Sequence, residues 1–132
     1  MVDYTGKNAE GLKEKTLYLL DMDGTIYNEN EIFEGTLDLL REIEERGGQY
    51  VFITNNSSKS VEDYIEKVRA MGIQASYENF YTSSQATAMY LQENYANQRV
   101  YCMGTRSLVE ELRRAGISVV TEVDDRATVV LL

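Results

Sequence analysis

Two aspartates, Asp21 and Asp23, stand two positions apart directly after the apolar run Leu17–Leu20. Four consecutive apolar residues suit a strand that is buried on both faces of a parallel sheet. Gly24 follows the aspartates and allows the backbone to turn sharply. Open α/β sheets bind their ligands at the carboxyl ends of such strands. If the chain turns there, both carboxylates can reach one point, where one attacks an electrophile and the other transfers a proton.

A second polar segment follows the next predicted strand, 50–54. It comprises Thr54, Asn55, Asn56, Ser57 and Ser58. If the two strands are adjacent and parallel, these side chains and the backbone N–H groups lie beside Asp21 and suit an anion such as phosphate. A carboxylate that attacks phosphate is repelled by it, so a divalent cation between them is needed. Oxygen ligands favour Mg²⁺, which binds one or two carboxylates and several waters.

Strands and helices alternate along the rest of the chain. Further strands are predicted at 99–104, 117–120 and 127–132, with a short extended segment at 79–84. Helices are predicted at 36–46, 84–96 and 106–115, and between Ser60 and Gly72. The last of these has an apolar stripe and a potential cap formed by Ser60 and Asp63. This alternation is typical of right-handed crossovers, and it predicts an α/β fold with a doubly wound parallel sheet.

Composition limits the classes of protein to be considered. The 132 residues, 43% apolar and 27% charged, suit one globular domain. The net charge of −9 argues against nucleic acid or an anionic membrane as a partner. With one cysteine, Cys102, the chain forms no internal disulfide, and a reducing compartment fits. No apolar run approaches the ~20 residues of a membrane span, and the polar start 1–15 is no signal peptide, so a cytoplasmic location is expected.

Three sequence motifs carry a resemblance to a known family. "DMDGT" at 21–25 follows an apolar strand, and "FITNNSS" at 52–58 follows some thirty residues later. These segments resemble motifs I and II of the haloacid dehalogenase (HAD) superfamily. Together with "YTSSQATAMYL" at 81–91, they make the chain similar to the NagD-like, 4-nitrophenylphosphatase branch. The resemblance runs from about Leu17 to Leu132 and implies a HAD-like, Rossmann-like core.

The resemblance implies a role for each motif residue. Asp21 would be the nucleophile that forms an aspartyl-phosphate, and Asp23 the general acid and base. Mg²⁺ would be held by the Asp21 side chain and the Asp23 backbone carbonyl. Gly24 and the segment after the second strand would contact the phosphoryl group. In that segment the implied residues are Thr54 and Asn55, with Asn56 nearby.

The resemblance also implies parts that this sequence lacks. Nothing in the 132 residues matches the lysine of motif III, the acidic cluster of motif IV or the cap domain that selects the substrate, and Lys59 is not that lysine. We therefore expect residues 1–132 to form the N-terminal part of a HAD-like core, with 1–15 as a polar extension and little activity alone. The chain ends inside an apolar run, which indicates a piece of a longer protein; a short edge strand at a true terminus is the alternative.

Three classes of function remain open. The first is a Mg²⁺-dependent hydrolase of small phosphorylated metabolites. The second is a signalling receiver domain, which also accepts a phosphoryl group on an aspartate at a strand end. The sequence Asp23-Gly24-Thr25 favours the hydrolase, because a hydrolase must give a proton to a leaving group. The third is a binding fragment without catalysis. The sequence leaves both a monomer and a homo-oligomer open.

Overall fold

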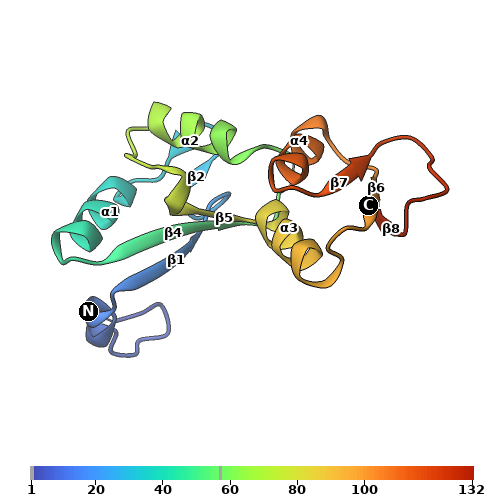
Figure 1. Cartoon of the computed structure of the whole chain (residues 1–132). Coiled ribbons are helices and arrows are strands. Elements are labelled where there is room, and N and C mark those ends of the chain that lie inside the picture. Colours follow the sequence, from blue (N-terminus) through green and yellow to red (C-terminus); the bar gives the residue numbers. More distant parts are fainter. Residues whose placement is uncertain (1, 57) are drawn as a thin grey trace.

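The structure, a computed structural model, describes residues 2–56 and 58–132 and has two lobes that lie next to each other (Figure 1). The first lobe contains a parallel sheet of order β1-β4-β5, formed by Leu17–Asp21, Gln49–Thr54 and Phe80–Thr82. Between β1 and β4 lie the short hairpin β2–β3 (Tyr27–Asn28 and Glu31–Ile32) and helix α1 (Thr36–Glu45). Helix α2 (Val61–Ala70) and the 3₁₀ turn η2 (Tyr77–Asn79) connect β4 to β5, and the turn η1 (Glu10–Glu14) precedes β1.

The second lobe contains a second parallel sheet, of order β7-β6-β8. Its strands are β6 (Arg99–Cys102), β7 (Ser118–Val120) and β8 (Val129–Leu131). Helix α3 (Ser83–Asn94) leads into β6, and α4 (Arg106–Arg114) connects β6 to β7. The predicted α/β class with parallel strands is thereby confirmed.

The parallel strands divide between two sheets. Strand β6 pairs with β7 and β8 and, within the described residues, with no strand of the first sheet. Its apolar residues pack with α3 and α4 in a separate core that contains Val100, Leu91 and Leu112. A run of apolar residues predicts that a strand forms, but it does not say which sheet the strand joins.

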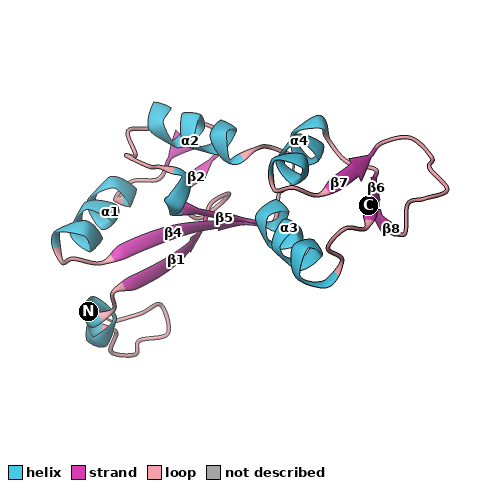
Figure 2. Cartoon of the chain, in the orientation of Figure 1, coloured by secondary structure: helices cyan, strands magenta, loops and turns pink. Residues whose placement is uncertain are grey.

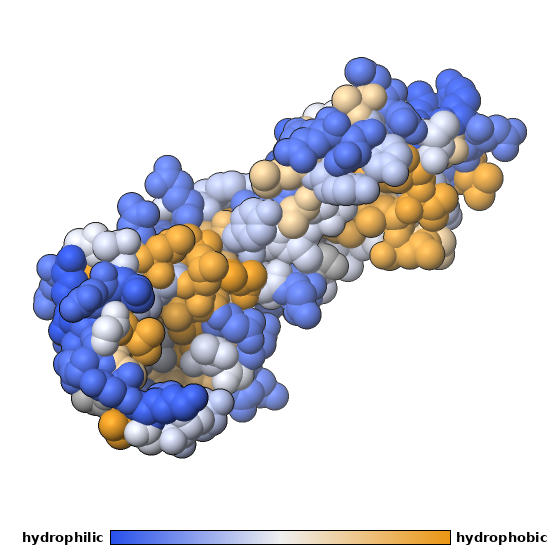
Figure 3. Space-filling view, turned by 90° about the horizontal axis from the view of Figure 1, so that it is seen from below, coloured by the Kyte–Doolittle hydropathy of each residue, from blue (hydrophilic) through white to orange (hydrophobic). Residues whose placement is uncertain are grey.

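Within residues 2–56 and 58–132, helices cover only one face of the first sheet (Figure 2). Figure 2 shows α1 and α2 on the same side of β1, β4 and β5. The core on that side includes the rings of Phe52 and Phe80, which are tilted against each other with their centroids 5.4 Å apart. On the other side Leu17 and Leu19 are 55% and 60% exposed, and Figure 3 shows apolar side chains gathered on that face. The prediction that β1 is buried on both faces is therefore wrong in this chain.

Helix α2 begins and packs as predicted. Ser60 accepts a hydrogen bond from the Asp63 amide, and the Asp63 carboxylate accepts one from the Ser60 amide, which completes a capping box. Tyr64 and Val68 of the predicted stripe are buried against the sheet. No helix in the described part of the chain is long and apolar enough to cross a membrane.

Candidate functional site

The segment after β1 is a tight turn held by buried side chains. Asp21 is the last residue of β1, and Met22 and Ile26, on either side of the turn, are almost fully buried. The Ile26 amide donates to the Met22 carbonyl at 2.9 Å, and the Gly24 amide donates to the Tyr27 carbonyl at 2.8 Å. Gly24 has φ +82°, a conformation that side chains disfavour. The anchored turn leaves Asp21 and Asp23 exposed at the carboxyl edge of the sheet.

Asp23 has a cationic neighbour that sequence reasoning missed. Lys67 of α2 places Nζ 3.9 Å from Asp23 Oδ1 and 3.8 Å from the centroid of the Tyr27 ring. The Lys67 side chain is only 15% exposed, and this burial lowers its pKa; Lys59 acts in the same direction and Asp23 opposes them. No local pattern marks Lys67, because only the packing of α2 on the sheet brings it to the turn. It supplies local positive charge in a strongly acidic chain.

The polar segment after β4 is also fixed by hydrogen bonds. Thr54 is 5% exposed, and its hydroxyl accepts from the Asn56 amide at 3.2 Å. The carbonyl of Asn56 accepts from the Tyr64 hydroxyl at 3.1 Å, and the carbonyl of Asn55 accepts from the Ser83 hydroxyl at 3.1 Å. The side chains of Asn55 and Asn56 are exposed. Ser58 is exposed, and its amide donates to Asn56 Oδ1 at 3.0 Å. Ser57 lies outside the described residues.

The two segments lie at the same edge of the sheet. Strands β1 and β4 are adjacent and parallel, and Asp21 is opposite Ile53, one residue before Thr54. Neighbouring strands are about 4.8 Å apart. Side chains alternate between the two faces along each strand. Asp21 therefore points to the face that no helix covers, and Thr54 to the face that α1 and α2 cover. The sheet therefore brings the predicted residues together at one edge, with the two side chains leaving from opposite faces.

Two buried tyrosines show that both segments share an electrostatic environment. Burial raises the pKa of Tyr27 strongly, and the charges of Asp23 and Asp21 raise it further. Burial also raises the pKa of Tyr64; a hydrogen bond from Thr54 lowers it, and Asp23 raises it. Asp23 thus raises the pKa of both tyrosines, and Thr54 lowers that of Tyr64. On the covered side of this edge, Asp23, Thr54 and Lys67 therefore surround the neutral hydroxyl groups of Tyr27 and Tyr64.

The donor set fits a hydrated Mg²⁺ better than a fully protein-bound ion. In the described part of the chain, no group of three or more His, Cys, Asp and Glu residues could hold a metal. Asp21 and Asp23 provide two exposed carboxylates, the number that Mg²⁺ commonly takes. The amides of Thr25 and Ile26 donate to the Met22 carbonyl, so these turn bonds do not involve the Asp23 carbonyl.

Comparisons with known proteins agree with this arrangement. The family model described as haloacid dehalogenase-like hydrolase matches residues 18–118. A 5′-nucleotidase of Bacillus subtilis is 33% identical over 101 residues, which are 76% of this chain and 40% of that protein.

Two solved structures are similar in fold as well. A 4-nitrophenylphosphatase from Thermotoga maritima is 32% identical with a TM-score of 0.80, over 86% of this chain and 44% of that one. A glycerol phosphate phosphatase from Mycobacterium tuberculosis, in complex with magnesium, is 28% identical with a TM-score of 0.81, over 89% of this chain and 36% of that one. The chain thus spans about two fifths of the length of the relatives it matches.

Proposed function

The chain belongs to the family of haloacid dehalogenase-like hydrolases, and on that premise we propose that it provides the nucleophile-bearing part of a Mg²⁺-dependent phosphatase for small phosphate monoesters. The observation that carries the proposal is the anchored turn with Asp21 and Asp23 at the sheet edge that also holds Thr54. The names of the three relatives support it, because each acts on a different phosphate ester.

In the proposed reaction, a carboxylate oxygen of Asp21 attacks phosphorus while the bond from phosphorus to the ester oxygen breaks. Asp23 gives its proton to the departing alcohol and then takes a proton from the water that attacks the aspartyl-phosphate. Hydrolysis releases inorganic phosphate and restores the Asp21 carboxylate. Thr54 and Asn55 would donate hydrogen bonds to the phosphoryl oxygens, with Gly24 and Asn56 beside them.

A bound Mg²⁺ would offset the repulsion between the phosphate and the Asp21 carboxylate. In this proposal the Asp21 carboxylate and the Asp23 carbonyl would hold the ion. Support comes from the exposure of the two aspartates and from the magnesium in the structure of the glycerol phosphate phosphatase. The lysine of motif III and the acids of motif IV have no counterpart in these residues, so we expect slow release of phosphate from this chain.

A burst experiment tests the nucleophile without depending on fast turnover. The chain is mixed with Mg²⁺ and 4-nitrophenyl phosphate, and nitrophenolate is measured together with the intact mass after acid quenching. We expect up to one equivalent of nitrophenolate, an added phosphoryl group, and loss of both in Asp21→Asn or without Mg²⁺. Full activity of Asp21→Asn would refute the assignment. If the chain does not react with this ester, but acetyl phosphate phosphorylates it and the phosphoryl group stays bound for minutes, the receiver alternative is favoured.

A further inference from the structure

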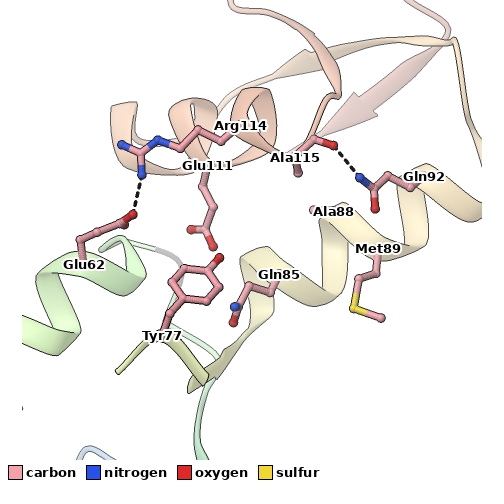
Figure 4. A pocket seen from close by; sticks show the side chains of 9 residues that line it. All are labelled: Glu62, Tyr77, Gln85, Ala88, Met89, Gln92, Glu111, Arg114 and Ala115. Atoms are coloured by element: carbon pink, nitrogen blue, oxygen red, sulfur yellow. Dashed lines mark hydrogen bonds and ion pairs between the residues drawn. The ribbon is translucent and has the colours of Figure 1, made fainter. Parts of the chain in front are cut away.

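A cavity of about 350 Å³ lies at the junction of the two lobes (Figure 4), and neither Asp21 nor Asp23 lines it. Glu62 of α2 and Tyr77 of η2 line it from the first lobe. Met89 of α3 and Glu111 and Arg114 of α4 line it from the second lobe. Its volume is within the range of sites for small organic molecules.

Glu111 is a buried carboxylate in this cavity, and no cation of the described residues forms an ion pair with it. The residue is 9% exposed, and neither carboxylate oxygen forms a hydrogen bond of normal geometry in the described part of the chain, although the Ser84 hydroxyl lies close enough to act on it. Figure 4 shows the carboxyl group directed toward Tyr77. Burial raises the pKa of Glu111, and Glu62 adds to this effect. Arg114 and the nearby Ser84 hydroxyl oppose it. A carboxyl group that is desolvated and unpaired costs free energy, which a suitable ligand can recover.

Arg114, one helical turn after Glu111 on α4, does not form an ion pair with it. Arg114 Nη1 instead forms an ion pair with Glu62 Oε1 at 2.7 Å. The Gln92 side-chain amide is also engaged, because it donates to the Ala115 carbonyl at 2.5 Å. With Glu111 ionised, the walls carry two carboxylates and one guanidinium, which leaves one negative charge uncompensated.

We propose that this cavity binds a small organic cation whose primary ammonium group pairs with Glu111. Tyr77 and Met89, each about half exposed, offer an aromatic ring and a thioether to the aliphatic part of the ligand and to its charge. A single available carboxylate does not suit a divalent metal ion, which needs more oxygen ligands. The Glu111 oxygens expose almost no surface. Tyr77 faces them in Figure 4, and the proposal requires this half-exposed ring to rotate so that a ligand can reach them.

Titration with n-butylammonium, followed by NMR of the whole chain, tests the proposal. We expect saturable shifts confined to residues around the cavity, and binding of the neutral probe 1-butanol at least about tenfold weaker, since it lacks the charged hydrogen bond. Glu111→Gln keeps the shape of the side chain and should weaken butylammonium binding to the same degree. Equal binding of both probes, no binding of either, or full binding by Glu111→Gln would overturn the proposal.

Two further variants separate the site from general charge effects. Glu110→Gln removes the same charge from the adjacent position of α4, where the carboxylate pairs with Arg106 at 2.7 Å outside the cavity. This variant should bind butylammonium as the unmodified chain does. Arg114→Gln removes the opposing charge and should tighten binding at low salt, even if Glu111→Gln fails to fold. Weaker binding by Arg114→Gln, or an equal loss in Glu110→Gln, would contradict the assignment.

Discussion

At the residue scale, the two aspartates have different proposed tasks, which different leaving groups can separate. Asp23→Asn removes the proton donor, so cleavage of an alkyl ester such as glycerol 3-phosphate should slow by roughly 10²–10⁴-fold. The nitrophenolate group leaves without protonation, so its burst should change much less. Single-turnover kinetics with both esters measure the difference, and Asp21→Asn, which should abolish both reactions, is the control. An equal slowing of both esters would argue against Asp23 as the acid.

Lys67 is the residue for which packing, rather than sequence, suggests a role. Its side chain is 15% exposed and its Nζ lies 3.9 Å from Asp23 Oδ1, so solvent screens its charge less than that of an exposed lysine. Lys67→Met should weaken the binding of inorganic phosphate about tenfold. Titration followed by ³¹P NMR in the presence of Mg²⁺ measures this constant. Lys59→Met is the matched control, because Lys59 is exposed and close enough to influence Lys67; an equal effect would indicate a general charge effect.

The two tyrosines behind the site form a natural pair for measuring stability. The Tyr64 hydroxyl donates to the Asn56 carbonyl at 3.1 Å, whereas the Tyr27 hydroxyl is buried near Asp23 and forms no hydrogen bond of normal geometry in the described residues. Tyr64→Phe should lower the free energy of unfolding by about 0.5–1.5 kcal/mol, and Tyr27→Phe should leave it unchanged or raise it. Urea denaturation measures both. If Tyr27→Phe lowers the free energy of unfolding more than Tyr64→Phe does, the Tyr27 hydroxyl has a hydrogen-bond partner in solution.

At the element scale, the start of α2 gives a prediction that depends on pH. Hydrogen bonds from the Ser60 amide and hydroxyl lower the pKa of Asp63 below its ordinary value of 3.8. Since the pKa is lower in the folded chain, the stabilisation is present above about that value and is lost as the pH falls through the lowered pKa. Urea denaturation should show that Asp63→Asn lowers the free energy of unfolding more at pH 7 than at pH 2. A loss of stability that is as large at pH 2 as at pH 7 would contradict this origin.

The beginnings of elements could be predicted from the sequence because local residues determine them. Ser60 and Asp63 form the predicted cap, and the apolar stripe of α2 faces the core. The carboxyl edge with Asp21 and Thr54 follows from two apolar runs that form neighbouring parallel strands. Lys67 and Glu111 could not be found in this way, because tertiary packing of α2 and α4 places them. The open face of β1 was missed because an apolar run shows that a strand forms, but not what covers it.

At the scale of the whole molecule, each lobe has its own hydrophobic core. The core of the first lobe contains Phe52, Tyr64 and Phe80, and that of the second contains Leu91, Val100 and Leu112. The two sets share no residue, and the chain passes from one lobe to the other where β5 meets α3. The cavity with Glu111 lies at this junction, so a ligand there would contact both lobes.

Separate cores predict that the lobes open independently. Leu112 is fully buried, so Leu112→Ala should cost about 2–5 kcal/mol in the second lobe. If the lobes open separately, amide hydrogen exchange should accelerate in β6 and α4 while β4 keeps its protection. Phe52→Leu, at a fully buried position of the first core, should give the reverse pattern. Equal acceleration in both lobes from either variant would instead mean that the sheets unfold as one unit, with the junction around Glu111 and Arg114 joining them.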